Sequence, residues 1–238
     1  MPGSDIKILS TRLMDQACID RAARHGIDIA HVPFVRVDMV ADAAIDTRIA
    51  ALAAENILAI FTSVNAVNAV IRKLDKKPCW TIACISGRTA TAAKEFFGRE
   101  QIKITGADGR ELARNIIIQS PVLPVVFFCG NLRMDYLPAE LAAHNIATEE
   151  ITVYHTTPAP VKVKDLYDGI VFFSPSAVDS FFRLNAVAAH VVLFAIGSTT
   201  ANHLKRYTGN PVLCSKHPSQ LSITESIIDY YDQKRSFT

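Results

Sequence analysis

The sequence predicts an α/β protein with two parallel-sheet domains, one of them inserted into the other. Short apolar runs alternate with amphipathic helical segments along all 238 residues. This alternation is typical of parallel sheets with helices on both faces. The length is large for one compact domain and suits two domains of about 100–120 residues each. A repeated motif, described below, also favours two similar halves.

The predicted elements follow one another in strand–helix order. The apolar runs predicted as strands are Ile6–Leu9, Asp28–Val32, Ile57–Phe61, Thr81–Ile85, Gln101–Ile104, Val125–Cys129, Gly169–Phe173, Val191–Ala195 and Pro211–Cys214. The predicted helices are Met14–His25, Ala43–Glu55, Asn65–Leu74, Asp108–Gln119, Asp135–His144, Ser176–Asn185, Thr199–Tyr207 and Ser219–Tyr231. Asp108 and Glu111 have the spacing of a capping box, and we assign them that structural role.

Two extended segments, Phe34–Val37 and Glu150–Tyr154, interrupt the alternation. Neither is followed directly by a helix of the kind that closes a βαβ unit, so both are predicted to link the domains and to pair with each other. The predicted first domain is discontinuous and comprises residues 1–34 and 157–238. The inserted domain comprises residues 38–150, and residues 34–37 and 150–156 form the linking strands.

An internal repeat supports two related halves. Phe61–Val67 matches Phe172–Val178 at an offset of 111 residues, with Phe, Ser, Ala and Val in the same places. About one strand later, Ile85–Thr89 matches Ala195–Thr199 at an offset of 110. Either match alone is weak, but two ordered matches at nearly the same offset indicate a duplicated strand–turn–helix plan.

Composition excludes several classes of protein. A net charge of +2, without a basic run containing aromatics, argues against nucleic-acid binding. No apolar run reaches the ~18–20 residues that span a bilayer, and Met1–Lys7 lacks the pattern of a signal peptide. The five cysteines and seven histidines lack metal-site or disulfide spacing. We therefore expect a cytoplasmic monomer without a metal or a membrane contact.

The repeated turns have the chemistry of anion-binding sites. Ligands of open parallel sheets bind at the carboxyl ends of the strands, where the first turn of the next helix presents unpaired N–H groups. Ser63, Ser174, Gly87 and Gly197 stand at such ends. Each serine alone is better explained as an N-cap, worth ~1 kcal/mol. Their repetition favours a ligand that faces a cleft shared by both domains.

A third turn, Phe127–Arg133, also places small polar residues between a strand and a helix. Arg133 is a candidate for binding a carboxylate, although a lone arginine here is more often solvated, and Cys129 either touches ligand or packs. Glycine-rich nucleotide motifs and a GxSxG elbow are absent from the sequence. The turns suit a ligand with several carboxylates or phosphates.

Taken in order, these segments resemble the uroporphyrinogen-III synthase family from Leu9 to about Ile228. The segments that carry the resemblance are Ser10–Arg12, Phe61–Ser63 with Ala66–Val67, Phe127–Arg133 with Leu137–Pro138, Ile151–Thr156, Phe172–Ser176 and Ala195–Ala201. The resemblance implies two flavodoxin-like or Rossmann-like domains joined by a two-stranded β-ladder. It implies a cofactor-independent lyase of haem biosynthesis that cyclises hydroxymethylbilane, with inversion of ring D and loss of water, to uroporphyrinogen III.

The resemblance also implies site residues. Tyr154, in the Ile-Thr-Val-Tyr block, is the candidate for assisting hydroxide departure; packing at the domain link is the alternative. Ala90 stands where the family has threonine, so Thr89 or Thr91 is expected to substitute. The predicted substrate-binding residues are Arg12, Thr62, Ser63, Gly87, Arg88, Thr89, Cys129, Gly130, Asn131, Arg133, Ser174, Pro175, Ser176, Gly197, Ser198, Thr199 and Thr200.

Two other functions remain open from sequence alone. A two-domain binding or sensor module for an anionic small ligand would have the same paired domains and hinge. A flavodoxin-like electron carrier would also fit the fold, and it would be yellow when purified.

Overall fold

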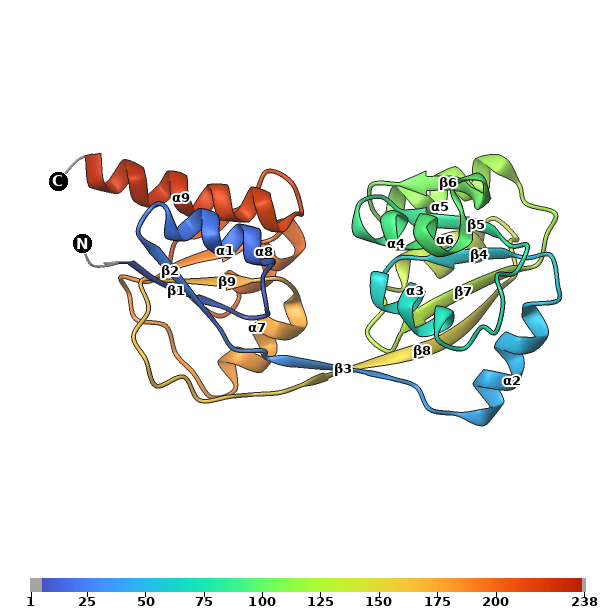
Figure 1. Ribbon diagram of the computed structural model, residues 1–238, viewed down its shortest axis with the longest axis horizontal. Coiled ribbons are helices and arrows are strands. Elements are labelled where there is room, and N and C mark those ends of the chain that lie inside the picture. The colour runs from blue at the N-terminus through green and yellow to red at the C-terminus, as the bar shows by residue number, and fades with distance from the viewer. Residues whose placement is uncertain (1–5, 237–238) are drawn as a thin grey trace. The chain divides into compact units, whose positions relative to one another are not determined.

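The computed structural model describes residues 6–236 (Figure 1). The expectation that no signal peptide is present concerns residues 1–5 in large part, which lie outside the described residues. The chain divides into two compact units: unit 1 contains the residues up to Arg36 and from Thr157 onward, and unit 2 contains Val37–Thr156. Each unit has one sheet, and nearly all strand pairs are parallel, so the predicted α/β class is confirmed.

Unit 1 contains a five-stranded sheet in the order β11-β10-β9-β1-β2. Its strands are β1 (Ile6–Ser10), β2 (Ile27–His31), β9 (Gly169–Phe172), β10 (Val192–Ala195) and β11 (Val212–Cys214). Helices α7 (Pro175–Phe182) and α8 (Ser198–Leu204) cover one face, and α1 (Gln16–Ala23) and α9 (Gln220–Ser236) cover the other.

The helices α1 and α9 lie side by side, blue and red in Figure 1. Arg21 of α1 pairs with Glu225 of α9 at 2.8 Å, and His25 contacts Asp232 at 2.9 Å. Ile8 of β1 and Ile223 of α9 are fully buried between the helices and the sheet. The apolar contacts supply most of the stabilisation, since exposed ion pairs contribute little.

Unit 2 contains a six-stranded sheet in the order β3-β8-β7-β4-β5-β6. Its strands are β3 (Val35–Met39), β4 (Leu58–Phe61), β5 (Thr81–Ile85), β6 (Ile102–Gly106), β7 (Val125–Gly130) and β8 (Thr148–Pro158). Helices α2 (Ala43–Leu52), α3 (Val64–Ile71) and α4 (Arg88–Phe97) cover one face, and α5 (Gly109–Gln119) and α6 (Tyr136–Ala143) the other.

Stacked aromatic rings fill one core of unit 2. Trp80 stacks on Phe128 and Phe97 with centroid distances of 5.5 and 5.9 Å, and Phe61 stacks on Phe128 at 5.4 Å. The Trp80 indole N–H donates to the carbonyl of Leu52 at 2.8 Å, so this buried polar group is satisfied.

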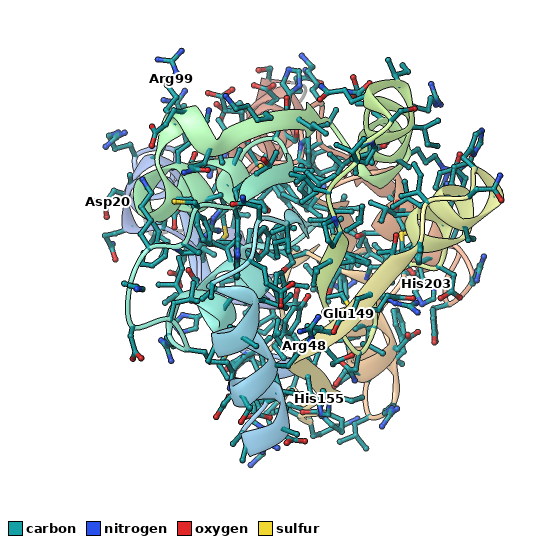
Figure 2. All side chains as sticks on the ribbon, turned by 90° about the vertical axis from the view of Figure 1, so that its right-hand side faces the viewer. Asp20, Arg48, Arg99, Glu149, His155 and His203 are labelled. Atoms are coloured by element: carbon teal, nitrogen blue, oxygen red, sulfur yellow. The ribbon has the colours of Figure 1, made fainter. Side chains whose placement is uncertain are left out.

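The helix α2 is tied to β8 by a two-point ion pair. The Arg48 Nε and Nη2 atoms donate to the two carboxylate oxygens of Glu149 at 2.9 and 2.7 Å (Figure 2). A guanidinium fork matches a carboxylate in this geometry, which fixes the orientation of the helix on the strand.

Three details differ from the sequence-based prediction or add to it. The repeat predicts a helix after Gly87 without bounds, and the structure forms it, as α4, over Arg88–Phe97. The strand β8 is longer than residues 150–156 and pairs in parallel with β7, so it closes a β7–α6–β8 unit besides lying next to β3. Glu111 accepts the N–H of Ala107 rather than of Asp108, so the capping box is incomplete, whereas Asp108 caps α5 as predicted.

The strand orders place one switch point in each unit. In unit 1, the connections from β1 lead to one side of the sheet and those from β9 to the other, although β1 and β9 are neighbours. In unit 2, β4 and β7 stand in the same relation. Ligands of such sheets bind outside the carboxyl ends of the two strands at the switch point. In each unit, the candidate site therefore lies at the carboxyl ends of the two strands that flank the switch point.

Candidate functional site

The switch point of unit 1 brings Arg12 and Ser174 to neighbouring strand ends. Thr11 donates its N–H and its hydroxyl to the Val171 carbonyl at 3.0 and 2.8 Å, which fixes β1 against β9. The next residue, Arg12, holds its guanidinium carbon 4.5 Å from the ring centroid of Phe173. Ser10 donates to the Arg12 carbonyl at 2.6 Å. These contacts keep a cation at the edge of the sheet.

Ser63 and Ser174 both cap helices. The Ser63 hydroxyl oxygen accepts the Asn65 N–H at 3.1 Å, and the Ser174 oxygen accepts the Ala177 N–H at 3.2 Å. Ser174 also shares a 3.0 Å hydrogen bond with Ser176, and Pro175 begins the helix. A hydroxyl that accepts a capping bond keeps its own proton for donation. Capping therefore leaves the hydroxyl proton of each serine available for a second hydrogen bond.

The second pair of turns differs between the units. Gly87 has a φ of 79°, a left-handed conformation that favours glycine, whereas Gly197 is extended. Arg88, Ser198 and Thr199 are exposed, as a ligand-binding turn requires.

The threonines of these turns lie in different environments. Thr89 and Thr200 are 4% and 3% exposed, so their side chains are buried. These residues can offer a ligand only the backbone N–H groups of the first helical turn. Thr91 is exposed, and its hydroxyl donates to the Gly87 carbonyl at 3.2 Å. Thr200 is the counterpart of Ala90, so the buried Thr89 resembles it in exposure, whereas the exposed Thr91 does not.

The third turn, after β7, holds its polar side chains in contacts within unit 2. Arg133 pairs with both Glu150 and Asp135. Cys129 is 2% exposed, its sulfur lies 3.8 Å from the Ile151 carbonyl, and burial raises the pKa of its thiol. Cys129 thus packs as a neutral thiol, and Arg133 is already neutralised by carboxylates.

Tyr154 lies at the switch point of unit 2, together with Gly130 and Ser63. A β-carbon on Gly130 would lie 2.8 Å from the Tyr154 hydroxyl oxygen, so the ring rests on the glycine backbone. Burial raises the pKa of the Tyr154 phenol above its ordinary value, and a hydrogen bond with Ser63 opposes this change. Thr62 immediately precedes Ser63 at the end of β4 and is half-buried. The phenol is therefore neutral and available as a donor.

The sequence did not reveal how these residues are held. The partners of Arg133 and the contact between Tyr154 and Gly130 depend on which strands are neighbours, and spacing along the chain carries no signal for either. The register between β7 and β8 is the signal that would have indicated both contacts. Within residues 6–236, no group of three or more His, Cys, Asp or Glu side chains could hold a metal ion. None of the helices described combines the length and apolarity needed to cross a bilayer.

Comparison with known proteins gives one family and one fold. The family model described as uroporphyrinogen-III synthase HemD matches residues 16–225. The crystal structure of uroporphyrinogen-III synthetase from Helicobacter pylori is similar with a TM-score of 0.69 and 16% identity, covering 94% of this chain and 99% of that one. A mutant uroporphyrinogen III synthase from Thermus thermophilus gives a TM-score of 0.65 and 16% identity, covering 96% and 99%. At 16% identity, the two structures show that the fold is shared, and nothing more.

Proposed function

The chain belongs to the uroporphyrinogen-III synthase family, and we propose from this premise how its residues carry out the reaction. The reaction cyclises hydroxymethylbilane, inverts ring D, releases water and gives uroporphyrinogen III. The family is a cofactor-independent cyclising lyase of haem biosynthesis. The match of the family model over residues 16–225 carries this function, and it leaves no support for the sensor or the electron carrier.

Substrate binding is assigned to the carboxyl ends of the strands in each unit. The helices after β4, β5, β9 and β10 begin there, and their first N–H groups suit the carboxylates of the bilane. Arg12 adds a positive charge in unit 1. The exposed backbone at Arg88, Ser198 and Thr199 adds further donors. Arg133 contributes through the position of its turn rather than as a free cation, because Glu150 and Asp135 already bind it.

Tyr154 is assigned to the departure of the terminal hydroxyl. As the C–O bond breaks, the pyrrole nitrogen supplies the electron pair and the hydroxyl gains negative charge. A neutral phenol can donate its proton to that oxygen, which leaves as water, and the proton that ring D loses on closure returns to the phenolate. A tyrosine phenol is protonated at neutral pH, and burial raises the pKa of Tyr154 further. The azafulvene cation that remains is attacked by ring D through a spiro intermediate.

An isomer-resolved product assay tests the function. Purified protein is given enzymatically generated hydroxymethylbilane, and the oxidised products are separated by chromatography. We expect the type III isomer in excess over the type I isomer of uncatalysed closure. Accumulation of type I alone would exclude the synthase.

A single substitution tests the role of Tyr154. Tyr154→Phe removes the donor and keeps the ring, so kcat should fall several-fold while KM changes little. Tyr230→Phe is the matched control, because Tyr230 is a partly buried tyrosine of α9 that packs against Phe194. Full activity of Tyr154→Phe would remove Tyr154 from the mechanism.

We also propose that the protein acts as a cytoplasmic monomer without nucleic acid. The absence of a long apolar stripe in the sequence supports the monomer, and the small net charge of +2 argues against nucleic acid. Sedimentation equilibrium at micromolar concentration should give the mass of one chain, and a mass twice as large would contradict the monomer.

A further inference from the structure

We propose that Asn131 is a positioning residue for Tyr154, acting through the backbone of β8. The inference rests on the proposed role of Tyr154 in hydroxyl departure. Strands β7 and β8 pair in parallel up to Cys129 and Thr152, and then the register shifts so that Gly130 pairs with Tyr154. The shift adds one residue to β8. Extra residues of this kind re-aim a side chain and are frequent next to active sites.

The register shift has a visible effect on the side chains of β8. Val153 is fully buried, and its neighbour Tyr154 also packs against the same core cluster. Successive residues of a regular strand point to opposite faces. The irregularity therefore turns the Tyr154 ring toward the end of β7, where only the Gly130 backbone fits beneath it.

Asn131 holds the strand after this shift through three hydrogen bonds. Its N–H donates to the Tyr154 carbonyl at 3.2 Å. Its side-chain oxygen accepts the Thr156 N–H at 2.7 Å, and its side-chain nitrogen donates to the Thr156 carbonyl at 3.3 Å. The amide thus takes the place of the next ladder residue, although β7 has already ended at Gly130.

This arrangement determines which way the phenol points. Ser63, with its oxygen occupied by the Asn65 N–H, keeps a proton to donate to the Tyr154 oxygen. The phenol proton then stays available for the substrate. Without the Asn131 contacts, residues 154–156 lose two side-chain hydrogen bonds and the ring can leave Gly130. A misplacement of about 1 Å is enough to lower a rate strongly.

A double-mutant cycle on the full-length protein tests the proposal. Asn131→Ala should lower kcat several-fold, by no more than Tyr154→Phe does, with KM changed by less than about twofold. In the Tyr154→Phe background, Asn131→Ala should cause no further loss beyond about twofold, because both act through one group. Asn131→Asp, which keeps the oxygen that accepts from Thr156, should retain more activity than the alanine variant.

Asn185 provides the matched control in unit 1. Its side chain makes the same kind of contact, since it accepts the Val163 N–H at 2.8 Å and donates to the Val161 carbonyl at 2.8 Å. Asn185→Ala should lower the unfolding midpoint as Asn131→Ala does and leave kcat unchanged. An equal loss of kcat in both variants, or additive losses in the Asn131–Tyr154 cycle, would overturn the positioning role.

A direct readout separates this inference from the catalytic assignment. The Tyr154 phenol is titrated by NMR with isotope-labelled tyrosine, its signal assigned by its absence in Tyr154→Phe. Asn131→Ala should shift its pKa toward the ordinary tyrosine value, because the ring becomes more exposed. An unchanged titration would reject the positioning role even where Tyr154→Phe lowers kcat. A shifted titration would support it even where Tyr154→Phe remains fully active, in which case only the catalytic assignment fails.

Discussion

The α-carbon of Gly130 lies against the ring of Tyr154, and this contact needs the absence of a side chain rather than unusual backbone freedom. Gly130 is absent from the positive-φ glycines among the described residues, so its conformation is open to alanine. The space above Gly130 does not admit a methyl group, because an added β-carbon would lie 2.8 Å from the Tyr154 hydroxyl oxygen. The glycine therefore sets the position of the phenol.

Gly130→Ala should lower kcat several-fold while the protein stays folded, because the methyl group displaces the Tyr154 ring. Steady-state kinetics and a thermal melt measure the two effects. Gly209→Ala is the control, since nothing lies within 4 Å of a β-carbon there. An active Gly130→Ala variant would show that the ring tolerates displacement.

Single residues also show where sequence reasoning stops. The sequence predicts Arg133 as a cation for the substrate, but Glu150 and Asp135 bind it. The pair with Asp135 could be predicted from the sequence, because Asp135 is only two residues from Arg133. Glu150 reaches Arg133 only because β8 lies beside β7. Asn131 was predicted as a substrate contact, and its amide is bonded to Thr156. Predicting these partners requires strand order and register.

At the level of elements, the sequence predicted the strand positions better than the helices. Buried parallel strands are continuous apolar runs, and Thr81–Ile85 has the predicted bounds. The helix α4 begins after Gly87, as the repeat predicts, but its bounds were not predicted, since Thr89 and Thr91, β-branched residues of modest helix propensity, occupy its first turn. The helix is held instead by Ala93 and Phe97, which are fully buried against the sheet. Tertiary packing decided this element.

The contact between α7 and α8 gives a pH-dependent prediction. Asp179 accepts from the Tyr207 hydroxyl at 2.6 Å and contacts the His203 ring nitrogen at 2.6 Å. Burial raises the pKa of this carboxyl, but the two hydrogen bonds outweigh burial and the pKa is lowered. The folded state therefore binds fewer protons than the unfolded state. The stabilisation is present above the ordinary aspartate pKa and is lost as the pH falls through the folded value.

Asp179→Asn should lower the unfolding midpoint near neutral pH, and the difference from the parent protein should shrink below about pH 4. Thermal melts followed by circular dichroism between neutral and acid pH measure this. The exposed Asp75 supplies the control Asp75→Asn. A difference that is the same at every pH would contradict the assignment.

At the level of the whole molecule, five strands have the same arrangement in the two sheets but follow one another in a different order along the chain. The order β8-β7-β4-β5-β6 in unit 2 corresponds to β2-β1-β9-β10-β11 in unit 1. In unit 2 the β7–α6–β8 segment comes last, and in unit 1 its counterpart β1–α1–β2 comes first. The units are circular permutations of each other. The sequence repeat therefore extends only over β4–α4 and β9–α8, where the chain order agrees.

Unit 2 is continuous in sequence and has cores on both sheet faces. We expect residues 37–156 to fold when expressed alone. Trp80, the single tryptophan of the chain, is fully buried there, so its fluorescence reports on this unit. The fragment should unfold cooperatively, with the emission of the full-length protein. A gradual change without a transition would show that unit 2 depends on the rest of the chain.

The pairing of β1 with β9 has a consequence for how the protein is made. Thr11 donates its N–H to Val171, a partner 160 residues later in the chain. At roughly 5–20 residues per second, the ribosome needs roughly 10–30 s to deliver β9 after β1 has emerged. During that interval the β9-facing edge of β1 lacks its partner, while unit 2 is completed and can fold on the ribosome. Until β9 has been synthesised, this edge of β1 is therefore open to pairing with other chains.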